Sequence, residues 1–283
     1  MASVANPSIV KQLVREHNIR AKKRWGQHFL ISPPVVERVL QLADITAEDR
    51  VLEIGPGLGA LTERLLQLAE RVVAVEIDAR LAALLRQRLG DDPRLQVIEA
   101  DVLAVDLAEI ITGGRWKVVG NLPYYITSPI LKKFLESALP LQSLTLMMQK
   151  EVAQRLAASP GGKDYGLLTV AVQYYARVLP GGVVSPGCFW PQPEVESALL
   201  KLLPGQQEAV EVCSREAFFE VARALFGQRR KIMGNALQSL KGVALERREL
   251  DRRIRRTGID PGRRGETLSL PEIALLTNSI YLE

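Results

Sequence analysis

Residues 118–126 read VVGNLPYYI, and this stretch holds the side chains with the clearest chemical use. An apolar run ends at Gly120, and an amide, a proline and two tyrosines follow. The exocyclic amine of adenine is a poor nucleophile, because its lone pair is delocalised into the ring. Two acceptors aimed at its hydrogens make it nucleophilic. The Asn121 side-chain oxygen and the Leu122 carbonyl suit this task, in a turn that Pro123 fixes.

The two tyrosines of this turn receive different interpretations. Tyr124 is expected to offer a platform on which a nucleobase stacks. Tyr125 is expected to pack against the sheet instead, because neighbouring side chains usually point in different directions. A methyl sulfonium is an excellent leaving group, so positioning would supply most of the catalysis and no strong general base is needed.

A second candidate site is the sequence VLEIGPGLGALTERL at residues 51–65, which reads as a strand, a glycine-rich turn and the start of a helix. Gly55, Gly57 and Gly59 let backbone amides approach a ligand closely. Glu76 follows about 20 residues later at the end of the next strand, where a carboxylate can accept hydrogen bonds from both hydroxyls of a ribose.

This pattern fits two ligand classes. GPGLGA satisfies the dinucleotide fingerprint, so a nicotinamide oxidoreductase remains an alternative. Three features favour S-adenosylmethionine: Glu53 precedes the glycine loop, Asp101 closes the third strand where it could contact an adenine amine, and no hydride-transfer partner is evident among two histidines.

The elements that must position these side chains alternate along the chain. Short apolar, β-branched runs indicate parallel strands at 50–55, 71–77, 95–100, 116–121 and 144–149. Helical spacing separates them, for example at 61–69, 79–89 and 128–139. This alternation predicts an α/β, Rossmann-like domain with a mostly parallel sheet. Residues 176–184 and 197–204 are expected to form a hairpin at its edge.

We expect two domains. Residues 1–204 would hold a basic N-terminal segment and the methyltransferase catalytic domain. After residue 204 strand patterns vanish and helical spacing continues, so residues 205–283 are predicted to form a small helical domain.

Composition excludes several other classes. Apolar residues make up 47% and charged residues 24%, as in ordinary globular proteins. Two cysteines and two histidines make a disulfide framework or a metal site unexpected, and a reducing cytoplasm fits. No apolar run approaches the ~20 residues that span a bilayer, so no membrane partner is expected.

Charge is concentrated near the ends of the chain. The first 30 residues carry six Lys or Arg against one Glu, and residues 205–265 carry 14 basic against eight acidic side chains. This distribution suits a polyanion held from two sides, although two solvated helical faces would explain it equally well.

Several motifs in order along the chain carry a more specific resemblance. They read KKRWGQHFL (22–30), VLEIGPGLGALT, EIDARL, EADVL, NLPYYITSPI, FWPQPEVESAL (189–199), LFGQRRK (225–231) and RRGETLSL (263–270). This ordered set resembles the KsgA/RsmA-type small-subunit rRNA adenine dimethyltransferases and covers nearly the whole chain.

The resemblance implies an activity and a partner. The family dimethylates two adjacent adenosines to N6,N6-dimethyladenosine in the 3′-end hairpin loop of 16S rRNA, within a small-subunit (30S) assembly particle, using S-adenosylmethionine. A monomer is expected because no apolar interface stripe stands out. The glycine loop and the resemblance together indicate these cofactor-binding residues: His28, Leu30, Gly55, Gly57, Glu76, Asp101 and Asn121.

The resemblance also implies RNA contacts, with residues 205–283 as a helical RNA-recognition domain. Phe189 would face the flipped base opposite Tyr124, or else be a core residue, and Trp25 would either pack or contact RNA. The basic residues expected at phosphates are Lys22, Lys23, Arg24, Arg229, Arg230 and Lys231. The run 247–256 is interpreted as a solvated helix face. A large-subunit rRNA methyltransferase of the macrolide-resistance type and a non-catalytic RNA-binding factor remain alternatives.

Overall fold

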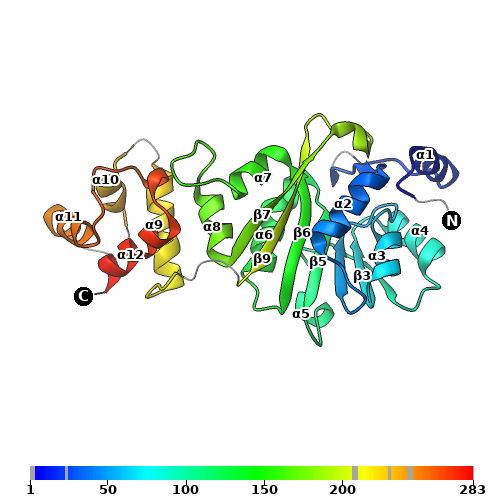
Figure 1. The fold of residues 1–283 in the computed structure, drawn as a ribbon, viewed down its shortest axis with the longest axis horizontal. Helices are drawn as coiled ribbons and strands as arrows, with labels where there is room; N and C mark the ends of the chain where they lie inside the picture. Colours follow the sequence, from blue (N-terminus) through cyan, green and yellow to red (C-terminus); the bar gives the residue numbers. More distant parts are fainter. Residues whose placement is uncertain (1–3, 23–24, 206–209, 229–230, 241–244, 283) are drawn as a thin grey trace. The chain divides into compact units, whose positions relative to one another are not determined.

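The structure is a computed structural model that describes residues 4–22, 25–205, 210–228, 231–240 and 245–282. The chain folds into two compact units, drawn as a ribbon in Figure 1. The first unit consists of Met1–Ala153 and Val178–Pro204. The second unit consists of Gln154–Arg177 and Gly205–Glu283.

The first unit is built on a seven-stranded sheet with the order β4-β3-β2-β5-β6-β9-β7. The parallel strands are β2 (Arg50–Ile54), β3 (Arg71–Glu76), β4 (Leu95–Glu99), β5 (Trp116–Asn121) and β6 (Leu141–Gln149). Antiparallel to β6 runs β9 (Ser197–Pro204), and β7 (Ala176–Val184) follows at the edge. The predicted Rossmann-like α/β fold with a mostly parallel sheet is confirmed.

The strand register brings the predicted site residues to one edge of the sheet. Ile54, the last residue of β2, pairs with Val75 on one side and with Gly120 on the other. Glu76 and Asn121 therefore end their strands next to the loop that starts at Gly55. In such folds ligands bind at the carboxyl ends of the strands.

Helices α2 (Pro33–Ala43) and α3 (Thr62–Leu68) cover one face of the sheet. Their apolar side chains join those of the strands in one buried cluster, which includes Val36, Leu65, Val51 and Val119. A separate cluster joins α1 (Pro7–Glu16) to α4 (Ala79–Leu89). The remaining helices of this region are α5 (Leu107–Ile110), α6 (Thr127–Leu135) and α7 (Lys150–Leu156).

A short two-stranded sheet joins two distant parts of the first unit. It pairs β1 (Phe29–Leu30) antiparallel with β8 (Phe189–Trp190), through Phe29 with Trp190 and Leu30 with Phe189. The GQHFL and FWPQP motifs therefore lie side by side, although the sequence separates them by most of the domain.

The second unit is helical. Its helices are α8 (Leu167–Tyr175), α9 (Arg215–Gly227), α10 (Met233–Leu237), α11 (Arg247–Arg256) and α12 (Leu270–Tyr281). They share a buried core that includes Phe218, Val221, Ile254 and Leu276. The predicted small C-terminal helical domain is therefore present.

The division of the chain differs from the predicted boundary at one stretch. Sequence placed residues 154–177 with the catalytic domain, whereas the structure groups them with the C-terminal helices. Buried Tyr165 donates a hydrogen bond of 2.9 Å to the Leu268 carbonyl, and Val170 belongs to the same cluster as Phe218. Helical spacing alone could not show which core this stretch joins.

Neither a membrane span nor a metal cluster occurs in the described part of the chain. None of its helices is long and apolar enough to cross a membrane. Nor do these residues contain a group of three or more His, Cys, Asp or Glu that could hold a metal ion.

Candidate functional site

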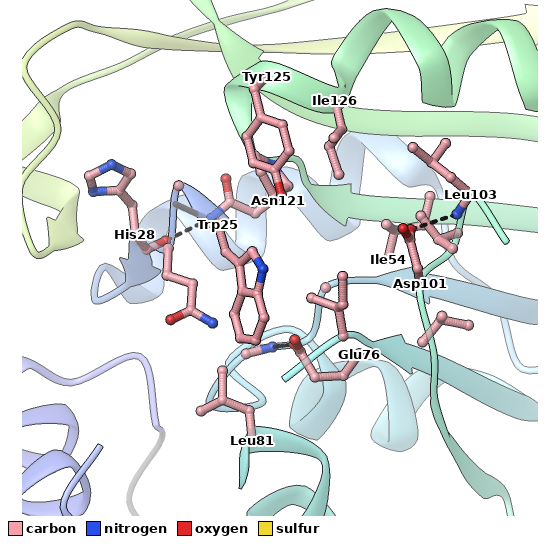
Figure 2. Close-up of a pocket in the computed structure, with 18 of the residues that line it drawn as sticks. Trp25, His28, Ile54, Glu76, Leu81, Asp101, Leu103, Asn121, Tyr125 and Ile126 are labelled. Atoms are coloured by element: carbon pink, nitrogen blue, oxygen red, sulfur yellow. Dashed lines mark hydrogen bonds between the residues drawn. The ribbon is translucent and has the colours of Figure 1, made fainter. Parts of the chain in front are cut away.

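A cavity of about 250 Å³ lies at the carboxyl edge of the sheet, and Figure 2 shows its lining. Predicted site residues that line it are His28, Gly55, Gly57, Glu76, Asp101, Asn121 and Pro123. A smaller cavity of about 40 Å³ shares part of this lining and adds Leu30 and Glu53. Side chains from five separate motifs therefore meet at one place, as their strand-end positions predict.

The glycine loop needs its glycines for backbone geometry and for space. Gly55 and Gly57 have φ values of +65° and +58°, in the left-handed region that other residues rarely adopt. A Cβ added at Gly57 would also lie only 3.1 Å from the Phe29 ring. The bare backbone of this loop forms part of the cavity wall.

Glu76 is held rigidly by the backbone at the end of β3. Its Oε2 accepts a hydrogen bond of 3.0 Å from the Gly57 N–H, and its Oε1 accepts one of 2.9 Å from the Asp78 N–H. Burial raises the pKa of this carboxyl, while the backbone donors oppose the shift. Each oxygen has further lone pairs, so the pair can still accept hydrogen bonds from a ligand's hydroxyls.

Asp101 follows β4 and lies at the cavity wall. Its Oδ1 accepts a hydrogen bond of 2.9 Å from the Leu103 N–H, which Figure 2 marks. Val102 and Leu103 line the cavity beside it. The arrangement places an exposed carboxylate next to apolar side chains, as recognition of a flat ring with a polar edge requires.

The Asn121 amide is oriented by a contact that the sequence did not indicate. Its Nδ2 donates a hydrogen bond of 2.9 Å to the His28 carbonyl (Figure 2). Because the nitrogen is engaged, Oδ1 remains the acceptor of this amide. The Leu122 N–H is bound to the Met147 carbonyl at 2.9 Å, while no described residue donates to the Leu122 carbonyl. Asn121 Oδ1 and the Leu122 carbonyl oxygen can therefore both accept hydrogen bonds from a ligand.

The two tyrosines differ in burial and in their relation to the cavity. Tyr124 is half-buried and does not line the cavity; its ring stacks on the His28 imidazole at a centroid distance of 5.9 Å and an interplanar angle of 26°. Tyr125 is 56% exposed and does line the cavity (Figure 2). The prediction that Tyr125 packs against the sheet is therefore wrong. Both residues belong to a short 3₁₀ turn, Tyr124–Ile126, in which successive side chains diverge by about 120°.

His28 and Leu30 approach the site in different ways. The His28 ring turns toward residues 189–197, where its Nδ1 lies 2.7 Å from the Pro191 carbonyl. The backbone carbonyl of His28, not the imidazole, meets Asn121. Leu30 is 6% exposed and lines only the smaller cavity. A backbone contact does not depend on side-chain type, so the sequence carried no signal for it.

Phe189 lines neither cavity. It is 3% exposed and packs in the core cluster with Leu30 and Leu199. The residue of its motif that reaches the turn after β5 is Ser197, whose Oγ lies 3.0 Å from the Tyr124 hydroxyl. Sequence reasoning missed Ser197, although it closes the FxPxPxVxS pattern.

Two further acids near the cavity were not predicted as site residues. Glu53 is 1% exposed, and burial raises its pKa to about 8, although a 2.6 Å hydrogen bond from Thr62 opposes the shift.

Burial alone would raise the pKa of Asp78 as well. Hydrogen bonds from Arg80, Gln27 and Lys22 outweigh burial and lower it to about 2. The ionised Asp78 thereby holds the N-terminal segment beside the cavity.

The basic residues expected at phosphates are only partly described. The Lys22 ammonium lies 3.3 Å from the Asp78 carboxylate and 3.7 Å from the centroid of the Trp25 ring. Lys231 is exposed. Lys23, Arg24, Arg229 and Arg230 lie outside the described residues.

The doubly wound sheet, the glycine loop after its first parallel strand and the carboxylate that closes the next strand define a Rossmann-like α/β protein with a nucleoside-binding type of site. The family model described as ribosomal RNA adenine dimethylase matches residues 18–276. The chain belongs to this family, as its motifs predict.

Individual relatives agree with this assignment. The chain is 46% identical over 288 residues to the ribosomal RNA small subunit methyltransferase A of Bacillus mycoides, a match that covers 100% of this chain and 99% of the relative. A dimethyladenosine transferase from Plasmodium falciparum superposes with a TM-score of 0.76 at 25% identity, over 88% of this chain and 96% of the other. The 23S rRNA methyltransferase ErmE superposes with a TM-score of 0.70 at 26% identity, over 89% and 99%.

Proposed function

We propose that this protein transfers methyl groups from S-adenosylmethionine to the exocyclic amines of two adjacent adenosines in the 3′-end hairpin loop of 16S rRNA. The product is N6,N6-dimethyladenosine, and the substrate is a small-subunit (30S) assembly particle. The observation that carries the proposal is the Asn121 amide, which is fixed through Nδ2 so that Oδ1 can accept from an amine beside the cavity. A monomer and a cytoplasmic location remain predictions from the sequence.

The residues around the cavity fit this cofactor. Glu76 suits the ribose hydroxyls, because both of its oxygens are already oriented by backbone donors. Asp101, beside Val102 and Leu103, suits the amine edge and faces of an adenine. The bare backbone at Gly55 and Gly57, with Leu30 in the smaller cavity, suits the amino-acid portion. When bound, S-adenosylmethionine supplies an electrophilic methyl group on a positively charged sulfur.

On the substrate side, two hydrogen-bond acceptors and one aromatic ring of this chain contact the target base. Asn121 Oδ1 and the Leu122 carbonyl accept the two hydrogens of the target amine, which localises its lone pair on nitrogen. Tyr124 provides a stacking surface for the base, worth about 1–3 kcal/mol for such contacts. The base must leave its own stack to reach the site, which costs a few kcal/mol.

A basic surface in the second unit suits the RNA backbone. Four exposed arginines lie within about 100° of arc on α11 and are called here the α11 arginine face: Arg248, Arg252, Arg255 and Arg256. Leu250 and Ile254 are buried on the opposite side of the helix. Arg252 pairs with Glu249, whereas the described residues contain no ion pair for the other three. This face is solvated, as the sequence predicts, and pairs within the helix neutralise only part of its charge. The three arginines without an ion pair among the described residues are proposed to contact RNA phosphates as well.

The choice of small-subunit RNA over large-subunit RNA rests on the degree of similarity. The relative named as a small-subunit enzyme is 46% identical over its whole length, whereas the 23S methyltransferase is 26% identical. The two share a fold and, we infer, the methyl-transfer chemistry. Target mapping decides between them.

The deciding experiment supplies the protein with labelled S-adenosylmethionine and undermethylated small ribosomal subunits, then maps the label by nuclease digestion and mass spectrometry. We expect dimethyladenosine at two adjacent positions of the 3′-end hairpin. Label in large-subunit RNA alone would support the rival specificity. Cofactor binding without transfer to either RNA would support a binding factor that has lost its chemistry.

A further inference from the structure

The segment 189–197 reaches Tyr124, in the turn after β5, by two routes. The first is direct: Ser197 Oγ lies within hydrogen-bond distance of the Tyr124 hydroxyl. The second is indirect: the Pro191 carbonyl contacts the His28 imidazole, and this imidazole stacks on the Tyr124 ring.

The Ser197 contact is buried and specific. Ser197 is 1% exposed, and its Oγ lies 3.0 Å from the Tyr124 hydroxyl. Burial raises the pKa of this phenol, so the hydroxyl stays protonated and can donate or accept. Ser197 opens β9 and pairs with Gln149 of β6, so the backbone of the central sheet holds it in place. A rigid strand thus fixes the far end of a side chain that projects from a loop.

The His28 contact restricts the same ring from one face. The imidazole is anchored by Nδ1 at 2.7 Å from the Pro191 carbonyl. Its ring lies 5.9 Å from the Tyr124 ring, centroid to centroid, within the range of directly stacked pairs. No base fits between the two rings, so the face of Tyr124 that lies on His28 is closed to substrate.

We propose that Ser197 is a positioning residue, which sets the plane of the Tyr124 ring, and that His28 backs one face of this ring so that the target adenine stacks on the other. The inference rests on the proposed function, since it assigns residues to the substrate side of that site. The FxPxPxVxS motif then acts through Ser197 at its last position, although Phe189 at its first position is buried.

The test compares Ser197→Ala, Tyr124→Phe and the double variant. Each single change removes one end of the same hydrogen bond and leaves the Tyr124 ring in place. We expect each to lower kcat for methyl transfer about three- to tenfold, the effect of one net hydrogen bond. The double variant should lose no more than either single one, because the two residues act as one unit.

Ser143→Ala is the matched control. Ser143 is also 1% exposed in the neighbouring strand β6, but its Oγ has no hydrogen-bond partner among the described residues. We expect this variant to keep wild-type kcat. All variants should bind S-adenosylhomocysteine with unchanged affinity in calorimetry, since none of the changed atoms lines either cavity.

The outcomes separate the inference from the proposed function. A wild-type protein that transfers no methyl group to either ribosomal RNA overturns the proposed function and the inference with it. An active wild type whose single losses add up in the double variant overturns the inference alone. Equal losses for Ser197→Ala and Ser143→Ala would also overturn it, because they would trace to core packing.

Discussion

Asn121 and His28 are joined by a hydrogen bond of 2.9 Å from the asparagine Nδ2 to the histidine carbonyl, across a sequence separation of 93 residues. This contact orients the Asn121 amide, with Nδ2 toward the His28 carbonyl and Oδ1 left as the acceptor. It also ties the segment that leads into β1 to the turn that follows β5. The conformation of the turn therefore depends on the N-terminal segment as well as on its own sequence.

Asn121→Asp should abolish transfer while leaving the fold intact. A carboxylate cannot donate to the His28 carbonyl, and its charge would be repelled by that oxygen. We expect methyl transfer to small subunits to fall about 100-fold or more, by analogy with the loss of one preorganised polar group in other active sites. Filter binding of the RNA should change little. Near-normal turnover in Asn121→Asp or Asn121→Ala would refute the assigned role.

Glu76→Ala should act on the cofactor instead. The change removes the acceptors for the Gly57 and Asp78 backbone N–H groups, so two donors at the cavity lose their partners. We expect the dissociation constant for S-adenosylhomocysteine to rise about tenfold to 100-fold, because charged hydrogen bonds contribute about 1.5–3 kcal/mol. Calorimetry measures this, and RNA affinity serves as the internal control. Unchanged affinity for S-adenosylhomocysteine would show that Glu76 does not bind the cofactor.

The sheet and the proposed cofactor-binding part of the cavity were predictable because they depend on local patterns. Parallel strands covered on both faces read as continuous apolar runs, and strand ends then fix where Gly55, Glu76 and Asp101 must meet. The position of each of these three residues depends only on its own strand and on the neighbouring strand in the sheet. Their convergence on one cavity follows from the strand order.

The proposed substrate-binding part of the site was less predictable because its contacts join distant segments. The Tyr124–Ser197 pair and the His28–Pro191 pair depend on how β8 and β9 return to the sheet, which periodicity does not reveal. The exposure of Tyr125 depends on a 3₁₀ turn, whose side-chain directions differ from those of a strand. The NLPY pattern favoured Tyr124 as the aromatic platform, but it did not show where either ring lies.

The pH dependence of stability should carry a contribution from Glu53. Its pKa is raised by burial to about 8 from a usual value of 4.5, so the folded state favours the protonated form. The stabilisation from Glu53 is fully present below pH 4.5 and is lost as pH rises through about 8. Glu53→Gln keeps an acceptor for the Thr62 hydroxyl but does not titrate.

Chemical denaturation between about pH 5 and about pH 8.5 tests this expectation. The free energy of unfolding of the wild type should fall with rising pH relative to that of Glu53→Gln. Thr62→Val is a useful comparison, since it removes the hydrogen bond that opposes the shift and leaves the acid in place. Parallel curves for wild type and Glu53→Gln would contradict a raised pKa at this position.

The α11 arginine face should determine part of the salt dependence of RNA binding. A triple variant, Arg248→Gln, Arg255→Gln and Arg256→Gln, removes three charges that have no ion-pair partner within the described chain. Each phosphate contact contributes about 0.7–0.9 to the slope of log K against log salt concentration. We therefore expect the slope for small-subunit RNA to become shallower by about 2 to 3 units.

A matched control removes three arginines of the first unit that already have ion-pair partners. Arg86 lies 3.7 Å from Glu99, Arg94 lies 2.7 Å from Asp92, and Arg64 lies 2.8 Å from Glu37. Changing these three to glutamine lowers net charge by the same amount, but we expect the slope to stay close to the wild-type value. Equal slopes for the two triple variants would show that RNA responds only to total charge, and the α11 arginine face would then have no specific role.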